Sequence, residues 1–91
     1  MADLIVTGEE ALKVVDSLTS TSLRILKLVS EERLDVSTIA RKLGLSEAYM
    51  SEEVRILEEA KLVNVSYERG KRGIRKLCGL AFARIIIVVK P

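Results

Sequence analysis

Residues 37–60 read Ser-Thr-Ile-Ala-Arg-Lys-Leu-Gly-Leu-Ser-Glu-Ala-Tyr-Met-Ser-Glu-Glu-Val-Arg-Ile-Leu-Glu-Glu-Ala, and their pattern decides the fold of the chain. Ser37 is placed to cap a short helix, and Gly44 offers the left-handed backbone conformation that ends one. Ser46 gives a second N-cap signal, after which apolar residues recur at helical spacing and predict a longer helix with one buried side. These apolar positions are Met50, Val54 and Leu57. The stretch therefore predicts a helix-turn-helix whose second helix keeps one face free.

Two further helices are predicted before this motif. Thr7 with Glu10 three residues later resembles a capping box, and an amphipathic pattern follows over residues 9–18. The serine- and threonine-rich break at 17–22 can cap the next helix, whose apolar face continues to about Glu32. Together with the motif, these helices complete a helical core.

The chain after Ala60 has the pattern of a β-hairpin. Residues 62–67 alternate apolar and polar side chains, as a half-buried strand does, and residues 74–77 can form the returning strand. Gly70 and Gly73 bracket Lys71-Arg72 in the turn between them. The expected fold class is therefore α+β, mainly α: a winged helix-turn-helix with a basic hairpin wing, formed by residues 1–91 as one domain.

Two apolar runs, at residues 4–6 and 84–89, lie outside this core and favour strands. An exposed apolar strand promotes aggregation, so we expect the two runs to pair, within one chain or between two copies. A chain of 91 residues is also small enough to gain from a partner subunit. We therefore expect a homodimer that uses both runs and the first helix.

Composition excludes several classes of protein. Hydrophobic residues make up 48% and charged residues 31%, which is a globular balance, and the longest apolar run is too short to cross a membrane. We see no signal peptide, so we expect a cytoplasmic protein without a membrane partner. Gln is absent and Asn64 is the only Asn, while Glu, Lys and Arg are abundant, a profile that indicates a thermophile.

Charge is distributed unevenly along the chain. The formal net charge is only +2, but residues 67–77 hold five basic side chains and one carboxylate, which leaves the remainder faintly acidic. A cluster of this kind in a hairpin turn favours contacts with nucleic-acid phosphates. The alternative is a solvated turn that serves solubility.

Candidate contact residues follow from the two free surfaces, the outer face of the second motif helix and the basic hairpin. Arginine and lysine pair with phosphate or guanine, serine and tyrosine with phosphate or base, and glutamate with the cytosine amino group. For Glu52, an ion pair with Arg55 is an equally good interpretation, and Arg41 and Lys42 can be simply solvated. The candidate DNA-binding residues are Arg41, Lys42, Ser46, Glu47, Tyr49, Ser51, Glu52, Arg55, Arg69, Lys71, Arg72 and Arg75.

No catalytic or metal-binding constellation is visible. The chain has no His, one Cys and no Gly-rich phosphate loop before a helix, so we predict neither an enzyme nor a metal site or cofactor. Cys78 stands among apolar residues and is interpreted as a small buried hydrophobe, in preference to a redox switch. Tyr67 and Phe82 are assigned to the core or to an interface.

Four segments together resemble the ArsR-like winged helix-turn-helix transcription regulators. They are Leu23-Arg-Ile-Leu-Lys-Leu-Val, Val36-Ser-Thr-Ile-Ala-Arg-Lys-Leu-Gly-Leu-Ser, Ile56-Leu-Glu-Glu-Ala-Lys-Leu-Val and Gly70-Lys-Arg-Gly. The last segment and the isoleucine-rich end are similar to a small archaeal and bacterial branch of the family. The resemblance implies a DNA-binding repressor or activator, usually a homodimer, with the Ser46 helix in the major groove and the hairpin against the minor groove or phosphates.

Two departures from the family limit this inference. Metal-sensing members use clustered Cys, His and carboxylate ligands, which this chain lacks, so metal sensing is not expected. Relatives commonly place basic residues where this chain has Glu52 and Glu53, whose carboxylates repel phosphate. The prediction is a sequence-specific regulator of double-stranded DNA. The alternatives are an architectural protein that coats DNA and a protein-interaction module that uses its acidic helix.

Overall fold

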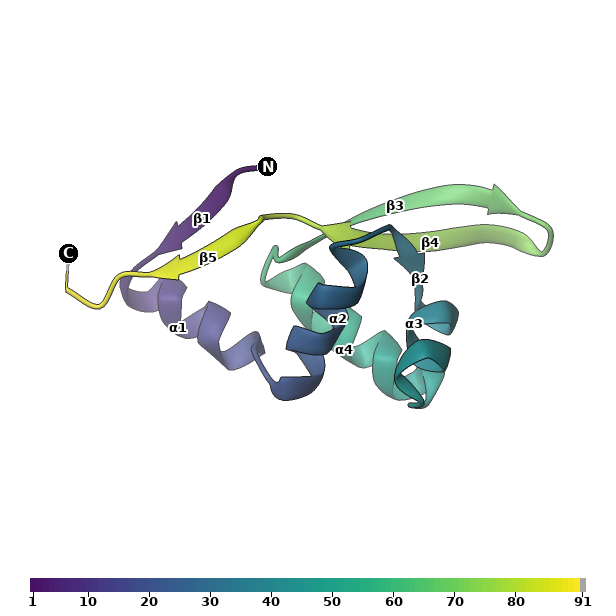
Figure 1. Cartoon of the computed structure of the whole chain (residues 1–91), viewed down its shortest axis with the longest axis horizontal. Coiled ribbons are helices and arrows are strands. Elements are labelled where there is room, and N and C mark those ends of the chain that lie inside the picture. Colours follow the sequence, from purple (N-terminus) through teal and green to yellow (C-terminus); the bar gives the residue numbers. More distant parts are fainter. Residues whose placement is uncertain (91) are drawn as a thin grey trace.

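The computed structural model describes residues 1–90 and has the architecture of a winged helix-turn-helix (Figure 1). This confirms the predicted fold class. The elements, in chain order, are β1 (Asp3–Val6), α1 (Gly8–Ser17), α2 (Ser20–Val29), β2 (Leu34–Asp35), α3 (Val36–Leu43), α4 (Glu47–Glu59), β3 (Val63–Gly70), β4 (Gly73–Leu80) and β5 (Arg84–Ile87).

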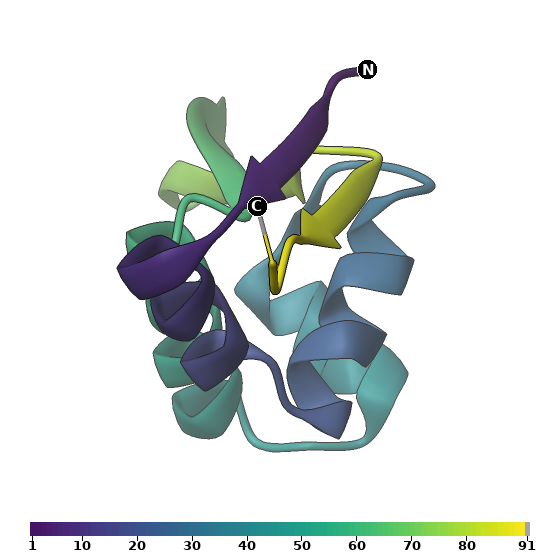
Figure 2. The same ribbon diagram turned by 90° about the vertical axis from the view of Figure 1, so that its left-hand side faces the viewer.

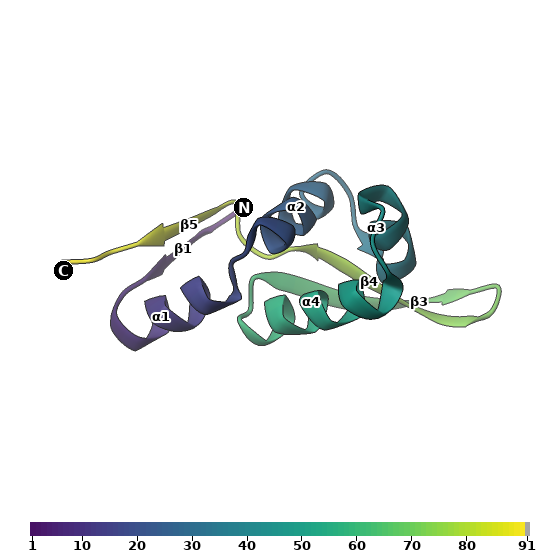
Figure 3. The same cartoon turned by 90° about the horizontal axis from the view of Figure 1, so that it is seen from below.

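The molecule is elongated, with extents of 49 × 24 × 19 Å. A terminal sheet made of β1 and β5 lies at one end of the longest axis, and the wing, formed by β3 and β4, extends from the other end (Figures 1 and 3). Helix α1 lies beside the terminal sheet, and α2, α3 and α4 lie nearer to the wing. The elements that we expect to form a dimer and the basic hairpin are therefore far apart.

The wing is part of a three-stranded antiparallel sheet with the order β2-β4-β3. Strand β2 pairs with β4 only through Leu34 opposite Cys78 and Asp35 opposite Leu77. From the Tyr67–Lys76 pair to the Gly70–Gly73 pair, the wing consequently continues as a two-stranded ribbon. It is longer than predicted, because β4 starts at Gly73 and runs on to Leu80.

A single apolar core joins the helices to the base of the wing. Its most deeply buried large side chains come from α2, α3, α4 and the residue just before β3, and each contributes about 1.5–3 kcal/mol relative to an exposed position. They are Ile25, Ile39, Met50, Leu57 and Leu62. Burial of Met50, Val54 and Leu57 confirms the predicted inner face of the motif's second helix.

The two apolar runs pair within the chain. Strands β1 and β5 are parallel, from Asp3 opposite Arg84 to Val6 opposite Ile87, and Figure 2 shows them above the helices. Val6 is buried, whereas Ile5 is 64% exposed. Pairing in one chain satisfies one edge of each strand, and whether a second copy binds there stays a prediction.

Two predicted helix caps are wrong. Asp35, not Ser37, caps α3, because β2 ends at Asp35 and its carboxylate accepts the backbone N–H of Thr38 at 2.8 Å. Thr7 precedes α1 but its side chain makes no cap hydrogen bond, and the first helical residue, Gly8, has a left-handed φ of 59°. In α2 the expected cap is present as a reciprocal pair between Thr19 and Ser22.

Some apolar side chains lie outside the predicted core. Leu12 and Val15 on α1 are 59% and 47% exposed, and Tyr67 on the wing is 65% exposed. Tyr67 is therefore not a core residue, because it lies on the two-stranded part of the wing where no helix covers it. Cys78 is buried as predicted.

Candidate nucleic-acid interface

The helix-turn-helix is built by α3, a tight turn and α4, which we call the recognition helix. Gly44 ends α3 with φ 69° and ψ 34°, the left-handed conformation predicted for it. Ser46 Oγ then accepts the backbone N–H of Tyr49 at 3.1 Å and begins the recognition helix. With the apolar side buried, seven side chains of the helix are left exposed. They are Glu47, Ala48, Tyr49, Ser51, Glu52, Arg55 and Glu59.

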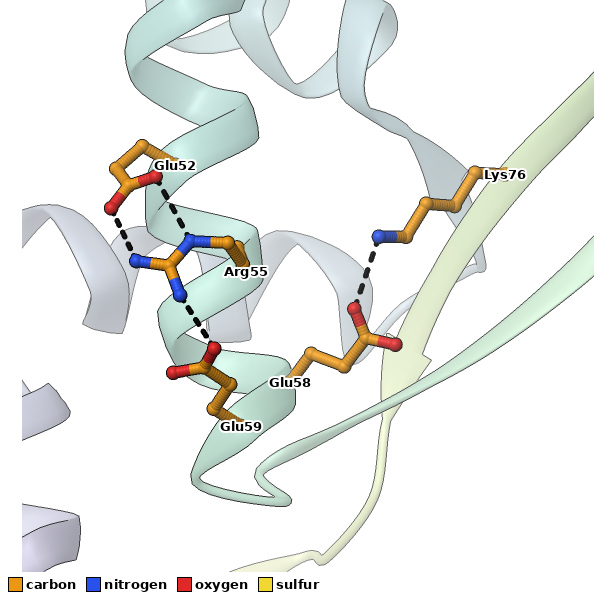
Figure 4. A network of polar contacts seen from close by, with 5 residues as sticks. All are labelled: Glu52, Arg55, Glu58, Glu59 and Lys76. Atoms are coloured by element: carbon orange, nitrogen blue, oxygen red, sulfur yellow. Dashed lines mark hydrogen bonds and ion pairs between the residues drawn. The ribbon is translucent and has the colours of Figure 1, made fainter.

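The one arginine of the recognition helix is already engaged by carboxylates of the same helix (Figure 4). Arg55 donates through Nε and Nη2 to Glu52 and through Nη1 to Glu59. The hydrogen bonds and charge of Arg55 lower the pKa of Glu52, and those of Glu52 and Glu59 raise the pKa of Arg55. The structure thus contains the Glu52–Arg55 ion pair that the sequence offered as an alternative to base contact.

Tyr49 leans toward the preceding helix. Its hydroxyl donates to Thr21 Oγ1 at 3.4 Å, and the side chain is 44% exposed. One turn later, Glu53 accepts a hydrogen bond from the Thr19 hydroxyl at 3.4 Å. Both contacts tie the recognition helix to the start of α2.

Arg41 and Lys42 are exposed on the last turn of α3. This location suits cations, because the carbonyl end of a helix carries partial negative charge. In the part of the chain that is described, no carboxylate forms an ion pair with either side chain. Both therefore remain available as candidate phosphate contacts.

The five basic residues of the wing divide into two groups. Arg75 is bound by Asp35 and Glu68, and Lys76 Nζ lies 3.0 Å from Glu58 Oε1 on the recognition helix (Figure 4). Arg69, Lys71 and Arg72 are exposed, and none of them forms an ion pair with a carboxylate among residues 1–90. We call residues 69–73 the wing tip, which holds these three charges.

Arg33 supports the base of the wing and was missed by sequence reasoning. Its guanidinium donates to the carbonyls of Asn64 and Leu77, at 3.0 and 3.4 Å, and to Ser66 Oγ at 3.2 Å. A Cβ atom on Gly79 would lie 2.3 Å from Arg33 Nη1, so a larger residue here would displace the guanidinium. The glycine inside a strand was the only signal in the sequence.

Other kinds of site receive no support from the described residues. Among residues 1–90, no three His, Cys, Asp or Glu side chains gather in a way that could hold a metal ion. Burial raises the pKa of the Cys78 thiol to about 11, so little reactive thiolate forms at neutral pH. In the same range, no helix is both long and apolar enough to span a membrane.

Comparisons with known proteins agree with this geometry. Residues 19–65, about half of the chain, match the family described as bacterial regulatory protein, arsR family. No curated protein matches the sequence significantly.

Several solved structures are similar. HlyU from Vibrio cholerae has a TM-score of 0.68 at 20% identity, covering 81% of this chain and 75% of HlyU. A homodimeric winged helix-turn-helix DNA-binding domain from Mycobacterium bovis has a TM-score of 0.70 at 23% identity, covering 80% of this chain and 65% of that one. ZitR from Lactococcus lactis is 33% identical, with a TM-score of 0.61, over 69% of this chain and 42% of its own.

Proposed function

The chain belongs to the ArsR family of bacterial regulatory proteins, and on this premise we propose that it is a homodimeric transcription regulator that binds specific sites in double-stranded DNA. The observation that carries the proposal is the unequal use of charge on the winged helix-turn-helix. Three basic side chains at the wing tip are left without a carboxylate partner among residues 1–90, whereas Arg55, the one basic residue of the recognition helix, is paired with Glu52 and Glu59 of the same helix.

In this mechanism, the wing tip supplies affinity and the recognition helix supplies selection. Lys71, Arg72 and Arg69 contact phosphates, which releases counterions and carries little sequence information. The outer face of the recognition helix enters the major groove with Ser46, Glu47, Tyr49, Ser51, Glu52 and Arg55 nearest to it. Arg41 and Lys42 contact phosphates of the DNA backbone beside the major groove. A regulator of this kind works where the genome is, so we expect it in the cytoplasm.

When the Glu52–Arg55 ion pair breaks, both side chains become free to contact bases. A released arginine binds guanine, and a released glutamate accepts from the cytosine amino group. While paired, the two side chains cancel each other's charge, so they add little to binding of random sequence. The proposed specificity therefore depends on exchanging an internal ion pair for contacts to a matching base pair.

The dimer is proposed to form at the terminal-sheet end of the molecule. An open apolar groove lies there, lined mainly by Leu12, Val15, Ile87 and Val89, each at least 41% exposed. Burial of such a surface is favourable, and large exposed apolar patches mark interaction sites. Because the wing extends from the opposite end of the long axis, a dimer joined here leaves both wings free (Figure 1). The similar Mycobacterium bovis domain is homodimeric, which supports a dimer but does not locate its interface.

The decisive experiment is a selection of bound duplexes from random DNA, followed by measurement of affinities at fixed salt. We expect an enriched site with two symmetric half-sites about one helical turn apart, bound at least about a thousandfold more tightly than random duplex. Equal affinity for all duplexes would point instead to an architectural protein. Sedimentation at micromolar concentration should give a dimer, and a monomer would contradict the proposed assembly.

A second function is favoured by the acidity of the recognition helix. Glu47 and Glu52 are exposed, and they repel phosphate but suit a basic protein partner. A protein-interaction module of this kind would not bind DNA even at low salt, where electrostatic attraction is strongest. Binding of any duplex at low ionic strength therefore excludes it.

A further inference from the structure

Arg75 stands at the point where the wing loses the support of its third strand. Strand β2 ends at Asp35, which is opposite Leu77, and Arg75 lies two residues before Leu77 in β4, on the same face and nearer to the wing tip. From the structure we propose that Arg75 is a positioning residue that fixes the wing to α3, and not a phosphate contact. The inference rests on the proposed function only where it concerns DNA.

The Arg75 guanidinium is held on two sides. Its Nε and Nη2 donate to Asp35 Oδ2, at 3.2 and 2.8 Å, and its Nη1 donates to Glu68 Oε1 at 3.0 Å. Glu68 is the residue directly across the ladder on β3. The Arg75 side chain therefore connects both strands of the wing to Asp35, the residue that caps α3. Its charge faces two carboxylates.

Asp35 divides its carboxylate between two tasks. Oδ1 accepts the backbone N–H of Thr38 and caps α3, while Oδ2 accepts from Arg75. The hydrogen bonds of Thr38 and the ion pair with Arg75 lower the pKa of Asp35 to about 2, so this carboxylate is ionised at neutral pH. The N-terminus of α3 and the wing thus share one charged anchor.

The backbone beside the anchor is shaped to fit the arginine. A Cβ atom on Gly70 would lie 2.8 and 2.9 Å from Cδ and Cγ of Arg75, so the stem of Arg75 packs where Gly70 has no side chain. Gly70 itself belongs to the wing tip, next to Arg69 and Lys71. The stem therefore touches the segment that carries the free charges.

A fixed wing matters because the ribbon beyond β2 is weak by itself. An isolated two-stranded hairpin is marginally stable in water, and only two residue pairs, Arg69–Ile74 and Gly70–Gly73, lie beyond Glu68–Arg75. Without the anchor, the wing tip samples many directions, and binding has to order it. The anchor thus keeps the three free charges in one place relative to the recognition helix.

The first test needs no DNA. Backbone dynamics and amide hydrogen exchange of residues 68–74 are measured by NMR in wild type, Arg75→Gln, Asp35→Asn and the double variant. Asn preserves the capping acceptor of α3 but not the charge, so helix capping is controlled. We expect both single variants to lose protection at the wing tip and the double variant to lose no more than either, because the residues act as a pair. Wild-type protection in Arg75→Gln would overturn the proposal.

The second test measures affinity for one duplex as a function of salt. Arg75→Gln should weaken binding about two- to fivefold, the range expected from an ion pair of this exposure, with an unchanged slope of log affinity against log salt. Lys71→Gln, the matched control at the wing tip, should lower the slope by about one. If Arg75→Gln lowered the salt slope by about one, Arg75 would be a phosphate contact and the proposal would be overturned.

A conservative variant separates geometry from charge. Lysine keeps the positive charge at position 75 but has no planar fork to bind Asp35 and Glu68 together. Arg75→Lys should therefore lose wing-tip order and affinity, like Arg75→Gln. Full wild-type affinity in Arg75→Lys would contradict a positioning role. If wild type binds no DNA, the proposed function fails, while the NMR measurement still decides the role of Arg75.

Discussion

The recognition helix and the wing tip use their charges in opposite ways. In the recognition helix, Arg55 lies between Glu52 and Glu59, so the one cation on the outer face is compensated within its own element. At the wing tip, Arg69, Lys71 and Arg72 face solvent without a carboxylate partner in the part of the chain described. A small net charge of +2 therefore conceals an acidic recognition helix whose only cation is paired and a wing tip whose cations are free.

The difference shows how a nearly neutral domain can still attract DNA. Long-range attraction depends on charges that are free to interact with phosphate, and pairs that cancel one another contribute little at a distance. Paired residues can still recognise a base at contact distance, because each partner then replaces its hydrogen bond to the other residue with a hydrogen bond to a base. The total charge of a small domain is thus a poor guide to nucleic-acid binding.

The largest expected effect comes from removing two charges of the wing tip. Lys71→Ala with Arg72→Ala should weaken binding to any duplex roughly 50- to 100-fold at 0.1 M salt and lower the salt slope by about two. The matched control is Arg24→Ala with Lys27→Ala, which removes two exposed cations from α2 and should leave the slope unchanged. Equal salt slopes in the two double variants would mean that the wing tip contacts no more phosphates than the surface of α2 does.

The pH dependence of stability distinguishes the anchored pair at Asp35 from the exposed pair at Glu52. The folded-state pKa of Asp35 is about 2, below its usual value of 3.8, so folding is favoured by the ionised form. This contribution, about 1–2 kcal/mol, is fully present above about pH 4 and is lost as the pH falls toward 2. Urea unfolding of wild type and Asp35→Asn should therefore differ at pH 7 and converge near pH 2.

The recognition helix supplies the comparison for this measurement. Glu52→Gln removes an exposed pair within one helix, and solvent screening leaves such a pair little effect on stability. Its effect on the free energy of unfolding at pH 7 should be clearly smaller than that of Asp35→Asn. Equal losses would mean that the contact between α3 and the wing stabilises the fold no more than a surface pair.

The base of the wing is tested by Gly79→Ala. The new methyl group displaces the Arg33 guanidinium and breaks its hydrogen bonds to the wing, which should lower the free energy of unfolding by about 1 kcal/mol. In an Arg33→Ala background the same substitution should cost much less, because nothing then occupies the space. Additive losses in the double variant would show that the two residues do not interact.

Of the two binding measurements, the smaller effect is expected in the recognition helix. Glu52→Gln with Glu59→Gln releases Arg55, and affinity for random duplex should rise about two- to fivefold at low salt. Specific binding should rise less or fall, because Glu52 no longer reads its base. A matched Glu9→Gln with Glu31→Gln variant removes two exposed carboxylates elsewhere and controls for net charge. An equal rise in affinity for random duplex in the two double variants would mean that Arg55 does not face DNA.

The helix-turn-helix could be predicted because its signals are local. The turn at Gly44, the cap at Ser46 and the spacing of Met50 and Val54 each depend on a few neighbouring residues. The ion pair between Glu52 and Arg55 was foreseen as an alternative for the same reason, since the two residues lie one helical turn apart. All of these features follow from backbone geometry within one or two turns.

The contacts that hold the wing could not be predicted in the same way. Asp35 and Arg75 are 40 residues apart in sequence, and Arg33 meets residues of β3 and β4 only after the sheet has formed. The wrong cap at Ser37 has the same cause, because the start of α3 is set by the pairing of β2 with β4. The count of five basic residues in the wing therefore included two, Arg75 and Lys76, that form ion pairs within the fold.

The parallel pairing of β1 with β5 sets an order in which the molecule folds. Asp3 and Arg84, joined by an ion pair, are 81 residues apart, whereas the helices and wing assemble between them from shorter-range contacts. Closing so long a loop is entropically costly, so the terminal sheet should form last. During synthesis on the ribosome, β1 is made before β5 and cannot pair with it until nearly the whole of this sequence has been translated. In that interval an apolar strand is unpaired, and an unpaired apolar strand is prone to aggregation.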